Sequence, residues 1–258
     1  WNHELAVPMA ALHKEDDEQK KAEFRAAIIK QMDIAGRTIY GDAISTPLVQ
    51  QFRDDELPPY IADARLIVDP PQKLLEDVSS EYQTVANELR DMMLAAEKEV
   101  LIFTPYFIPG KSGLEFIKQL KSNGIEVIIM TNSLATNNHT AVHSAYSSYR
   151  KDILEAGVEL WEARADAVQV TTEDGKLLPG KLTLHTKGII VDRDQVFVGS
   201  LNLDPRSIDI NTEMGLLIDS PELGGRLAAG FERRLPEIGY RLKLDDNGDL
   251  SWHSAVDG

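Results

Sequence analysis

The chain has 258 residues, 43% of them hydrophobic and 27% charged, which is the composition of a folded domain with a substantial core. Its net charge of −15 argues against a broad nucleic-acid-binding surface, because such surfaces are rich in Lys and Arg, although it is compatible with a small positive pocket. The absence of cysteine excludes disulfides, thiol chemistry and Cys-ligated metals. No apolar run approaches the ~20 residues of a membrane-spanning helix, so we expect any membrane contact to be peripheral or to use residues outside this sequence.

Residues 1–60 are expected to form a helical extension. Ala, Glu, Lys and Gln dominate residues 14–37, where Phe24, Ile28 and Met32 recur at helical spacing. Three prolines interrupt residues 38–60, which predicts a short helix and loops there.

Strands and helices alternate in the next part of the chain. Four apolar runs predict short buried strands, at residues 64–69, 100–105, 125–131 and 158–163. Three helices are expected: one with its inner face between residues 82 and 96, one opened by the capping-box pattern Ser112-x-x-Glu115 and ended at Asn123-Gly124, and one over residues 140–157. This order predicts an α/β domain over residues 61–258, with a mixed β-sheet flanked by helices.

The remainder of the chain continues the sheet. Residues 164–181 are polar and predict a loop or weak hairpin, and two strands are then expected to form a hairpin that turns at residues 192–194. Residues 213–219 predict a further strand, and Ser220-Pro221 is typical of a helix start, with Ser as the N-cap. The tail is expected to form a hairpin turning at Asn247-Gly248.

The candidate site begins with the stretch HTKGIIVD at residues 185–192. His185 and Lys187 are two apart, so on a strand they share one face, and burying an imidazole beside an ammonium is costly unless an anion lies with them. The hairpin returns to GSLN, where Ser200 and the amide of Asn202 can point at the same place, and Glu213 can hydrogen-bond the imidazole. These groups together predict a phosphate site that contains a nucleophile or an acid. The alternative is a strand with a satisfied histidine and a snorkelling lysine, but it leaves GSLN and Glu213 unexplained.

The motif His185-x-Lys187-x4-Asp192-x6-Gly199-Ser200-x-Asn202 resembles the signature of the phospholipase D superfamily. Three further stretches resemble the bacterial cardiolipin synthase branch, so that the likeness covers most of the chain from about Tyr60: TPYFIPG (104–110), TNSLATNNHTAVHSAYSSYRKDILEAGVELWE (131–162) and GSLNLDPRSIDINTEMGLLID (199–219). The resemblance implies a phospholipase D-like sandwich and a phosphatidyl-transferring enzyme without metal or other cofactor. It also implies a phospholipid substrate such as phosphatidylglycerol and a peripheral position at the bacterial inner membrane. No nucleic-acid partner is expected, because of the acidic net charge.

The resemblance assigns roles to the motif residues. It makes His185 a catalytic histidine, Lys187 and Asn202 phosphate ligands, and Glu213 the partner of His185, whereas Asp192 is mainly structural and holds the hairpin turn.

Enzymes of this branch carry the motif twice, and both copies build one site. No other histidine of this sequence has a lysine two residues later. We therefore expect the chain to be the C-terminal half of a longer enzyme cut at both ends, with residues 1–60 leading from a missing upstream domain. Its partner is then that missing half or a second copy of the chain, and the face that meets it should be apolar.

Five further residues are candidates for contacting substrate. Tyr106 and Asn132 follow strands whose carboxyl ends should face the site, where open α/β sheets bind ligands, although both can also be plain core residues. His143 either lines the head-group pocket or packs within its helix, Arg206 either reaches a phosphate or makes a salt bridge at a turn, and Ser200 belongs to the motif.

The resemblance implies a two-step displacement at phosphorus. One histidine forms a phosphohistidine, and the other protonates the leaving alcohol and then activates the incoming one. Because the first copy of the motif more often supplies the nucleophile, we expect His185 to be the general acid and base. The alternatives are a homodimeric single-motif phosphodiesterase or nuclease, and a non-catalytic domain that only holds phosphate or lipid.

Overall fold

The computed structural model describes residues 18–35, 60–75, 83–167, 169–171, 177–179 and 183–255. The chain divides into two compact units, one made of Trp1–Pro59 with Val170–Leu178 and the other of Tyr60–Gln169 with Pro179–Gly258. In the first unit, α2 (Glu18–Ala35) confirms the helix expected there. The expected short helix and loops before Tyr60 lie outside the described residues, and the origin of residues 1–60 as an extension from an upstream domain stays a prediction.

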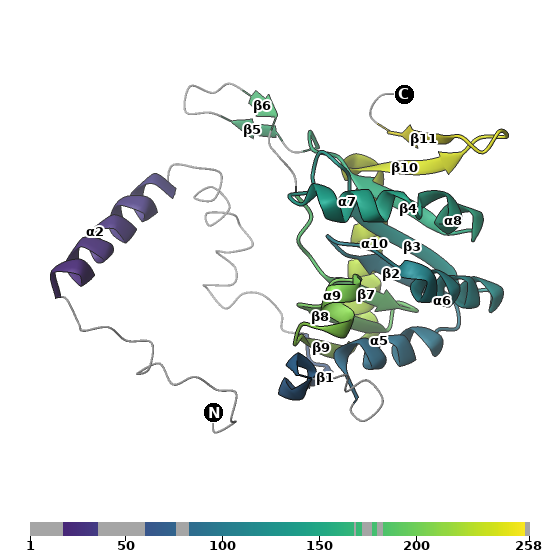
Figure 1. Ribbon diagram of the computed structural model, residues 1–258, viewed down its shortest axis with the longest axis horizontal. Helices are drawn as coiled ribbons and strands as arrows, with labels where there is room; N and C mark the ends of the chain where they lie inside the picture. The colour runs from purple at the N-terminus through teal and green to yellow at the C-terminus, as the bar shows by residue number, and fades with distance from the viewer. Residues whose placement is uncertain are drawn as a thin grey trace. The chain divides into compact units, whose positions relative to one another are not determined.

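A nine-stranded sheet forms the centre of the second unit, in the order β1-β9-β8-β7-β2-β3-β4-β10-β11 (Figure 1). The strands are β1 (Asp63–Val68), β2 (Glu99–Phe103), β3 (Glu126–Asn132), β4 (Glu159–Ala163), β7 (Gly188–Val191), β8 (Gln195–Gly199), β9 (Met214–Asp219), β10 (Gly239–Leu244) and β11 (Leu250–His253). Strands β2, β3 and β4 are parallel, and the other neighbouring pairs are antiparallel. The expected mixed sheet is confirmed, and β5 (Gln169–Thr171) with β6 (Leu177–Pro179) forms the separate hairpin expected after β4.

Helices cover both faces of the sheet, as expected. Figure 1 shows α5 (Val85–Leu94), α6 (Gly110–Ser122), α7 (Thr140–Ser147) and α8 (Arg150–Glu155) on one face and α10 (Pro221–Ile238) on the other. Two short helices, η1 (Pro71–Leu74) and α9 (Pro205–Asp209), follow β1 and precede β9. Across the helices in the described ranges, none combines the length and the apolar character needed to cross a bilayer.

The core lies in two layers because neighbouring residues of a strand point to opposite faces. Ile102 and Ile129 pack in the layer under α5 and α6, whereas Leu101 and Met130 pack in the layer under α10. Strands buried on both faces have continuous apolar sequences, which is why the sequence predicts β2 and β3 so clearly, whereas β4 includes Glu159 and Glu162.

The sequence prediction for the first strand is wrong in one respect. We expected a buried strand over residues 64–69, but among the residues of β1 only Ile67 is buried. The reason is that β1 forms the edge of the sheet and pairs only with β9. An apolar run does not distinguish an edge strand from a central one.

Two helix boundaries also differ from expectation. The helix α6 begins at Gly110, two residues before the proposed cap Ser112, and its N-cap Pro109 makes no side-chain hydrogen bond. The single helix expected over residues 140–157 is two, α7 and α8, with a break at Ser148 and Tyr149. By contrast, the Ser220 hydroxyl accepts from the Leu223 N–H, as the start of α10 requires.

Candidate active site

The topology brings the two motif segments to one edge of the sheet, at the carboxyl ends of β2, β3 and β4. Strand β7 runs antiparallel to β2 with Gly188 opposite Phe103, so residues 185–187 lie just beyond that edge. Residues 200–202 follow β8 at the same edge, and Glu213 immediately precedes β9 there. Open α/β sheets bind ligands at this edge.

We expect His185 and Lys187 to lie within a strand, but they lie just before β7, which begins at Gly188. The backbone pairing nevertheless reaches Lys187, whose carbonyl oxygen accepts from the Gly199 N–H at 3.2 Å. The Lys187 ammonium nitrogen lies 3.4 Å from both ring nitrogens of His185 and donates to the His185 carbonyl oxygen at 3.0 Å. The imidazole is exposed, so its ring can reach a ligand outside the sheet.

Lys187 is half-buried, and its electrostatics suit an anion site. Burial lowers the pKa of Lys187 from its ordinary value, and the negative charge of Glu213 acts in the opposite direction. A partly desolvated ammonium is short of compensating contacts, and a phosphate oxygen can supply them.

Asn132 anchors the segment that carries His185. It is 1% exposed, its amide donates to the backbone oxygens of Pro105 and Leu184 at 3.2 and 3.0 Å, and its oxygen accepts from the Leu184 N–H at 3.0 Å. Both N–H groups of the amide are therefore used by the backbone. The structure gives Asn132 a positioning role behind His185 in place of the substrate contact expected from the sequence.

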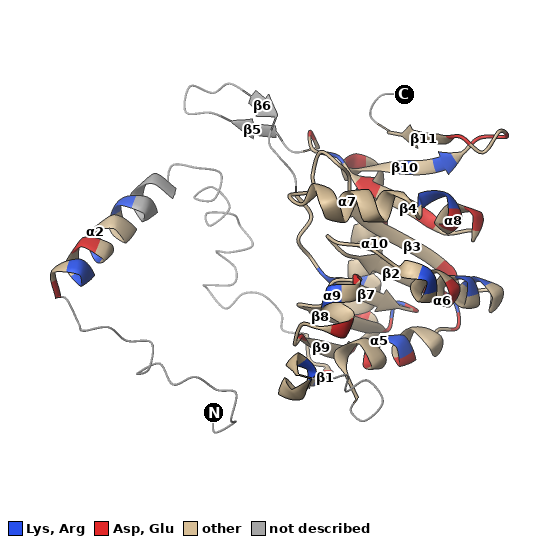
Figure 2. Cartoon of the chain, in the orientation of Figure 1, with Lys and Arg blue, Asp and Glu red and all other residues tan. Residues whose placement is uncertain are grey.

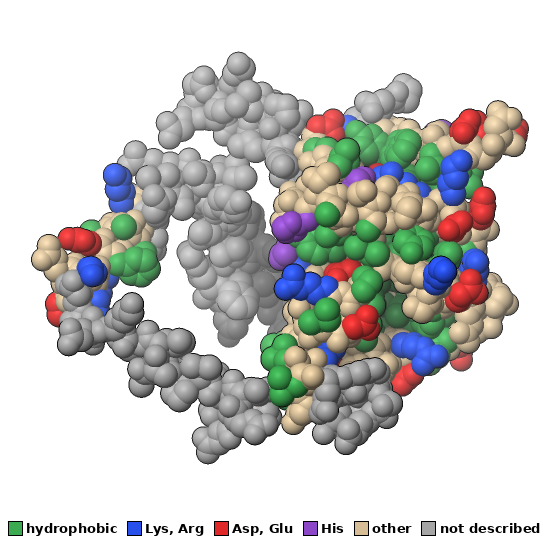
Figure 3. Space-filling view, viewed as in Figure 1, with side chains coloured by type: hydrophobic (Ala, Val, Ile, Leu, Met, Phe, Trp, Pro, Cys, Tyr) green, Lys and Arg blue, Asp and Glu red, His purple; other side chains and the backbone are tan. Residues whose placement is uncertain are grey.

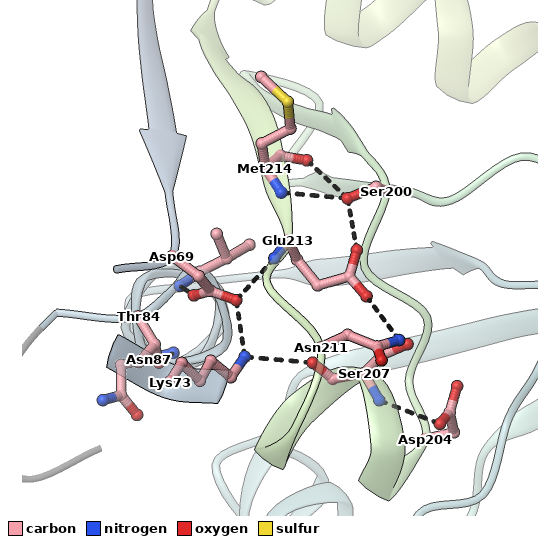
Figure 4. A network of polar contacts seen from close by, with 11 residues as sticks. Asp69, Lys73, Thr84, Asn87, Ser200, Asp204, Ser207, Asn211, Glu213 and Met214 are labelled. Atoms are coloured by element: carbon pink, nitrogen blue, oxygen red, sulfur yellow. Dashed lines mark hydrogen bonds and ion pairs between the residues drawn. The ribbon is translucent and has the colours of Figure 1, made fainter. Parts of the chain in front are cut away.

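The buried carboxylate of Glu213 is held by polar neighbours (Figure 4). The Ser200 hydroxyl donates to one carboxylate oxygen, and the Asn211 amide donates to the other at 3.4 Å. Ser200 also accepts from the Met214 N–H at 3.0 Å, which fixes the hydroxyl. The hydrogen bonds of the described residues include none between Glu213 and His185, so this pairing stays a prediction. The hydroxyl of Ser200 is used in the hydrogen bond that orients the Glu213 carboxylate.

Asn202 lies on the loop between β8 and α9 with its amide only partly satisfied. Its nitrogen lies 3.4 Å from the Ser207 hydroxyl, and its oxygen is buried without a hydrogen-bond partner in the described part of the chain. A hydroxyl can donate as well as accept, so a half-turn of the amide would satisfy the oxygen and place the NH₂ group at the buried position that the oxygen now occupies. Contact between Asn202 and a phosphate oxygen stays a prediction.

Sequence reasoning missed an ion pair beneath this loop, Asp69 with Lys73 (Figure 4). Both side chains are almost fully buried, and the ammonium nitrogen lies 2.6 Å from the carboxylate. Asp69 also accepts from the N–H groups of Glu213 at 2.9 Å and Val85 at 2.7 Å, and Lys73 donates to the carbonyl oxygen of Ser207 at 3.2 Å. The pair therefore ties down both Glu213 and the helix beside Asn202.

Asp192 is distant from this edge, at the opposite end of β7. Its carboxylate accepts from the backbone N–H groups of Glu97, Lys98 and Glu99 at 2.8 to 2.9 Å. It also begins the turn between β7 and β8, with a left-handed φ of 51°. The structure thus supports the structural role that the resemblance implies, and it separates Asp192 from the catalytic group.

We expect Asp192→Asn to lower the free energy of unfolding by about 1–3 kcal/mol at pH 7, since a neutral amide oxygen replaces a carboxylate that accepts three bonds. Asparagine tolerates the left-handed backbone, so the change adds no strain. Burial of Asp192 opposes its ionisation, but the three N–H bonds outweigh it and lower the pKa of Asp192. A lowered folded-state pKa contributes stability above the unfolded pKa of about 3.9, and this stability is lost as pH falls through the folded value.

Urea unfolding at pH 7 and at pH 3 measures this effect. The difference between Asp192→Asn and the wild type should shrink at pH 3. The exposed turn variant Asp246→Asn is the matched control and should behave as wild type at both values. An equal difference at both values would show that the charge of Asp192 contributes nothing.

Tyr106 and Arg206 are both near the edge that carries the motif. Tyr106 follows β2, is half-buried, and donates from its hydroxyl to the Asn138 amide oxygen at 2.7 Å. Arg206 is exposed and donates to the Asn211 amide oxygen at 3.3 Å, and in the described ranges it has no carboxylate partner. The salt-bridge alternative for Arg206 is therefore not observed, and substrate contact by either residue stays a prediction.

His143 is buried within the helical layer, at 6% exposure. Its Nε2 lies 3.0 Å from the Arg150 guanidinium, which also donates to Glu162 at 2.7 Å. Burial and then the charge of Arg150 lower the pKa of His143, with Glu162 acting in the opposite direction. This environment supports helix packing over head-group contact.

No group of three or more His, Cys, Asp or Glu side chains that could hold a metal ion occurs among the residues that the structure describes. The site offers instead an imidazole, an ammonium, an amide and a hydroxyl-supported carboxylate at one edge. Such a set can bind a phosphodiester and move a proton.

Comparison with known proteins agrees with this chemistry. Residues 89–235 match the family model described as "Cardiolipin synthase, PLD-like domain". Cardiolipin synthase C of Escherichia coli (strain K12) is 33% identical over 210 residues, which are 81% of this chain and 44% of that protein. An uncharacterized protein of Helicobacter pylori (strain ATCC 700392 / 26695) is 28% identical over 258 residues, 99% of this chain and 48% of that protein.

The solved structure of phosphatidylserine synthase from Haemophilus influenzae Rd KW20 has a TM-score of 0.51 at 19% identity, covering 72% of this chain and 41% of that one. This likeness shows the fold, and the chain spans less than half the length of both curated relatives. The family match covers more than half of the chain and includes both motif segments and Glu213. The chain therefore belongs to the phospholipase D-like domain family of the cardiolipin synthases, within the phospholipase D superfamily.

Proposed function

We propose that this chain supplies half of the active site of a phosphatidyltransferase that exchanges the alcohol of a phospholipid, with phosphatidylglycerol as donor. The observation that carries the proposal is the His185 imidazole beside the Lys187 ammonium, with Asn202 on the adjacent loop. The family match supports transfer chemistry on phospholipids, and cardiolipin is the product when the acceptor is a second glycerol head group. The enzyme would act peripherally on the bacterial inner membrane.

The reaction requires two imidazoles. One ring nitrogen attacks phosphorus, a P–N bond forms, and the P–O bond to glycerol breaks as the other histidine gives that oxygen a proton. The second histidine then removes the proton of the incoming alcohol, whose oxygen attacks phosphorus as the P–N bond breaks. Lys187 and Asn202 would hold the phosphate oxygens throughout. We assign the acid and base role to His185.

The second histidine would come from another motif-bearing half, because this sequence contains the motif once. The apolar half-sheet, which we define as Leu66, Val68, Val198, Met214 and Leu216, offers a surface for it. These side chains are 40 to 58% exposed on β1, β8 and β9, and Leu216 pairs with both Leu66 and Val198. A continuous exposed apolar surface of this kind is typical of an interface.

One feature of the surroundings favours lipid over nucleic acid. Lys and Arg are interspersed with Asp and Glu over α5, α6 and α8 and form no continuous basic stripe there (Figure 2), whereas a nuclease would need positive charge along its substrate groove. A cavity of about 650 Å³ with mostly apolar walls adjoins the apolar half-sheet beside α10, with Val198 in its lining. Arg226, Arg233 and Arg234 also line it, so this cavity does not discriminate between the two substrates.

The test is turnover of phosphatidylglycerol in mixed micelles, followed as release of glycerol and formation of cardiolipin. We expect this chain to be inactive alone and active after addition of the upstream half of the enzyme. Leu216→Arg should block that recovery if the apolar half-sheet is the interface. Activity of the chain alone that disappears in His185→Asn would indicate a homodimer, and cleavage of DNA in place of lipid would indicate a nuclease. Silence with and without the upstream half would leave a domain that only binds phosphate or lipid.

A further inference from the structure

A second cavity lies on the opposite face of the sheet, between α5, α6 and α9. Its volume is about 250 Å³, and its walls are mostly apolar. They include Leu89, Met93, Phe107, Phe116, Leu201 and Ile208. Apolar side chains, green in Figure 3, surround the hollow between these three helices.

Polar groups are confined to a few positions of the lining. They are the side chains of Asn87, Arg90 and Ser112. Arg90 is exposed on the outer side of α5 and makes no ion pair in the described part of the chain. An apolar cavity with one cation at its rim matches a ligand that has an apolar body and an anionic end.

The cavity lies directly behind the loop that carries Asn202. Leu201 and Leu203, the residues on either side of Asn202, both line it. Leu203 is fixed there, because its carbonyl oxygen accepts from the Ile108 N–H at 2.8 Å. The loop separates the cavity from His185, so an occupant would contact the back of the phosphate site and not the reacting atoms.

We propose that this cavity binds one alkyl chain of an amphiphile, with its anionic end at Arg90. An apolar cavity of about 150 Å³ is known to stay dry and to bind benzene, so the volume here is sufficient for a segment of a chain. The occupant that fits is a free fatty acid that binds independently of the reacting phospholipid, because the phosphate of that lipid would lie at His185, on the other side of the loop. The cavity proposal therefore does not rest on the proposed function.

The test is a fluorescence titration of the full chain with cis-parinaric acid, a fatty acid whose emission rises in apolar surroundings. Ala86 lines the cavity on α5, so Ala86→Phe should fill it and weaken binding at least about tenfold. Arg90→Glu should weaken binding severalfold, whereas Lys118→Glu is the matched charge reversal outside the lining and should leave it unchanged.

Saturable binding that is equal in the wild type and a folded Ala86→Phe variant overturns the proposal, and so does the absence of saturable binding. Circular dichroism checks that the variants fold. This readout needs no turnover. If the chain binds the probe but shows no activity on lipid, the proposed function is contradicted and the cavity proposal is still supported.

Laurate should displace the probe. In the active, complemented enzyme, Ala86→Phe should leave the chain-length dependence of KM, compared between dilauroyl- and dihexanoyl-phosphatidylglycerol, as in the wild type. A rise in KM for the dilauroyl form alone would overturn independent binding and assign the cavity to a chain of the reacting lipid.

Discussion

His185→Asn should reduce turnover of phosphatidylglycerol by the complemented enzyme at least about a thousandfold without loss of folding. Positioned proton transfer alone contributes about 10²–10⁴-fold to a rate, and removal of a covalent nucleophile costs more. The fold should survive because the imidazole is exposed, while the backbone on either side is held by Asn132 at Leu184 and by Gly199 at Lys187.

The matched control is His253→Asn. His253 is an exposed histidine on β11, at the far edge of the sheet. The complemented His253→Asn enzyme should therefore turn over lipid at the wild-type rate. The measurement is the initial rate of glycerol release, with thermal unfolding recorded in parallel. A His185→Asn variant that retains more than about a tenth of the rate would remove His185 from the chemical steps.

The same variant separates the two roles open to His185. A general acid matters most when the leaving alcohol is a poor leaving group, so a nitrophenyl ester of phosphatidic acid should lose much less rate than phosphatidylglycerol does. A nucleophile is needed whatever the leaving group. An equally large loss on both substrates would therefore assign the attack on phosphorus to His185, contrary to our expectation.

Much of the fold can be read from the sequence because its central strands are buried on both faces. The apolar runs of β2 and β3 contain no polar alternation, and the helix start at Ser220 is correct. The capping-box pattern Ser112-x-x-Glu115 is an exception, because α6 begins at Gly110. The errors arise where the same local signal serves two environments. The run that forms β1 is as apolar as a central strand, but its exposure depends on which strands pair with it.

The candidate site is predictable to the extent that its spacing is local. His185 and Lys187 are adjacent because they are two residues apart, and the turn places residues 200–202 beside them. Asn132 shows the limit: a polar residue at the end of a strand suggests a ligand contact, but its amide bonds to backbone 52 residues away. No spacing rule gives that partner.

The ion pair beneath the site could not be predicted either, because the segments that bury it are distant in the sequence. Asp69 follows a strand and Lys73 lies in a proline-rich turn, which is a typical surface sequence. Both become buried only because Glu213 and Ser207, more than 130 residues later, close over them. Burial of a charge by distant segments has no local signature, although an Asp and a Lys four residues apart permit a pair.

Replacement of Asp69 is the change with the largest expected effect on stability. Asp69→Ala should lower the free energy of unfolding by about 3–5 kcal/mol, because it leaves the Lys73 ammonium buried without a counter-charge. It also removes the acceptor of the Glu213 and Val85 N–H groups. Lys73→Met should cost less, about 1–3 kcal/mol, since those two N–H groups still hold the carboxylate.

Urea unfolding of the two single variants and the double variant forms a thermodynamic cycle. We expect the double variant to be less destabilised than the sum of the singles, because removal of both charges leaves neither one unpaired. Additive losses would mean that the two side chains act independently, despite a separation of 2.6 Å.

The pair also connects stability to catalysis. Lys73→Met frees the carbonyl of Ser207, the residue whose hydroxyl contacts Asn202, and so loosens the phosphate ligand that we propose, without altering Asn202 itself. The complemented Lys73→Met enzyme should therefore bind phospholipid with little change in KM but turn it over more slowly, and Lys73→Arg should restore part of kcat. A variant that loses stability while kcat stays at the wild-type value would confine the pair to folding. Loss of kcat with partial recovery by arginine would instead show that the buried charges hold Asn202 in the geometry that phosphoryl transfer requires.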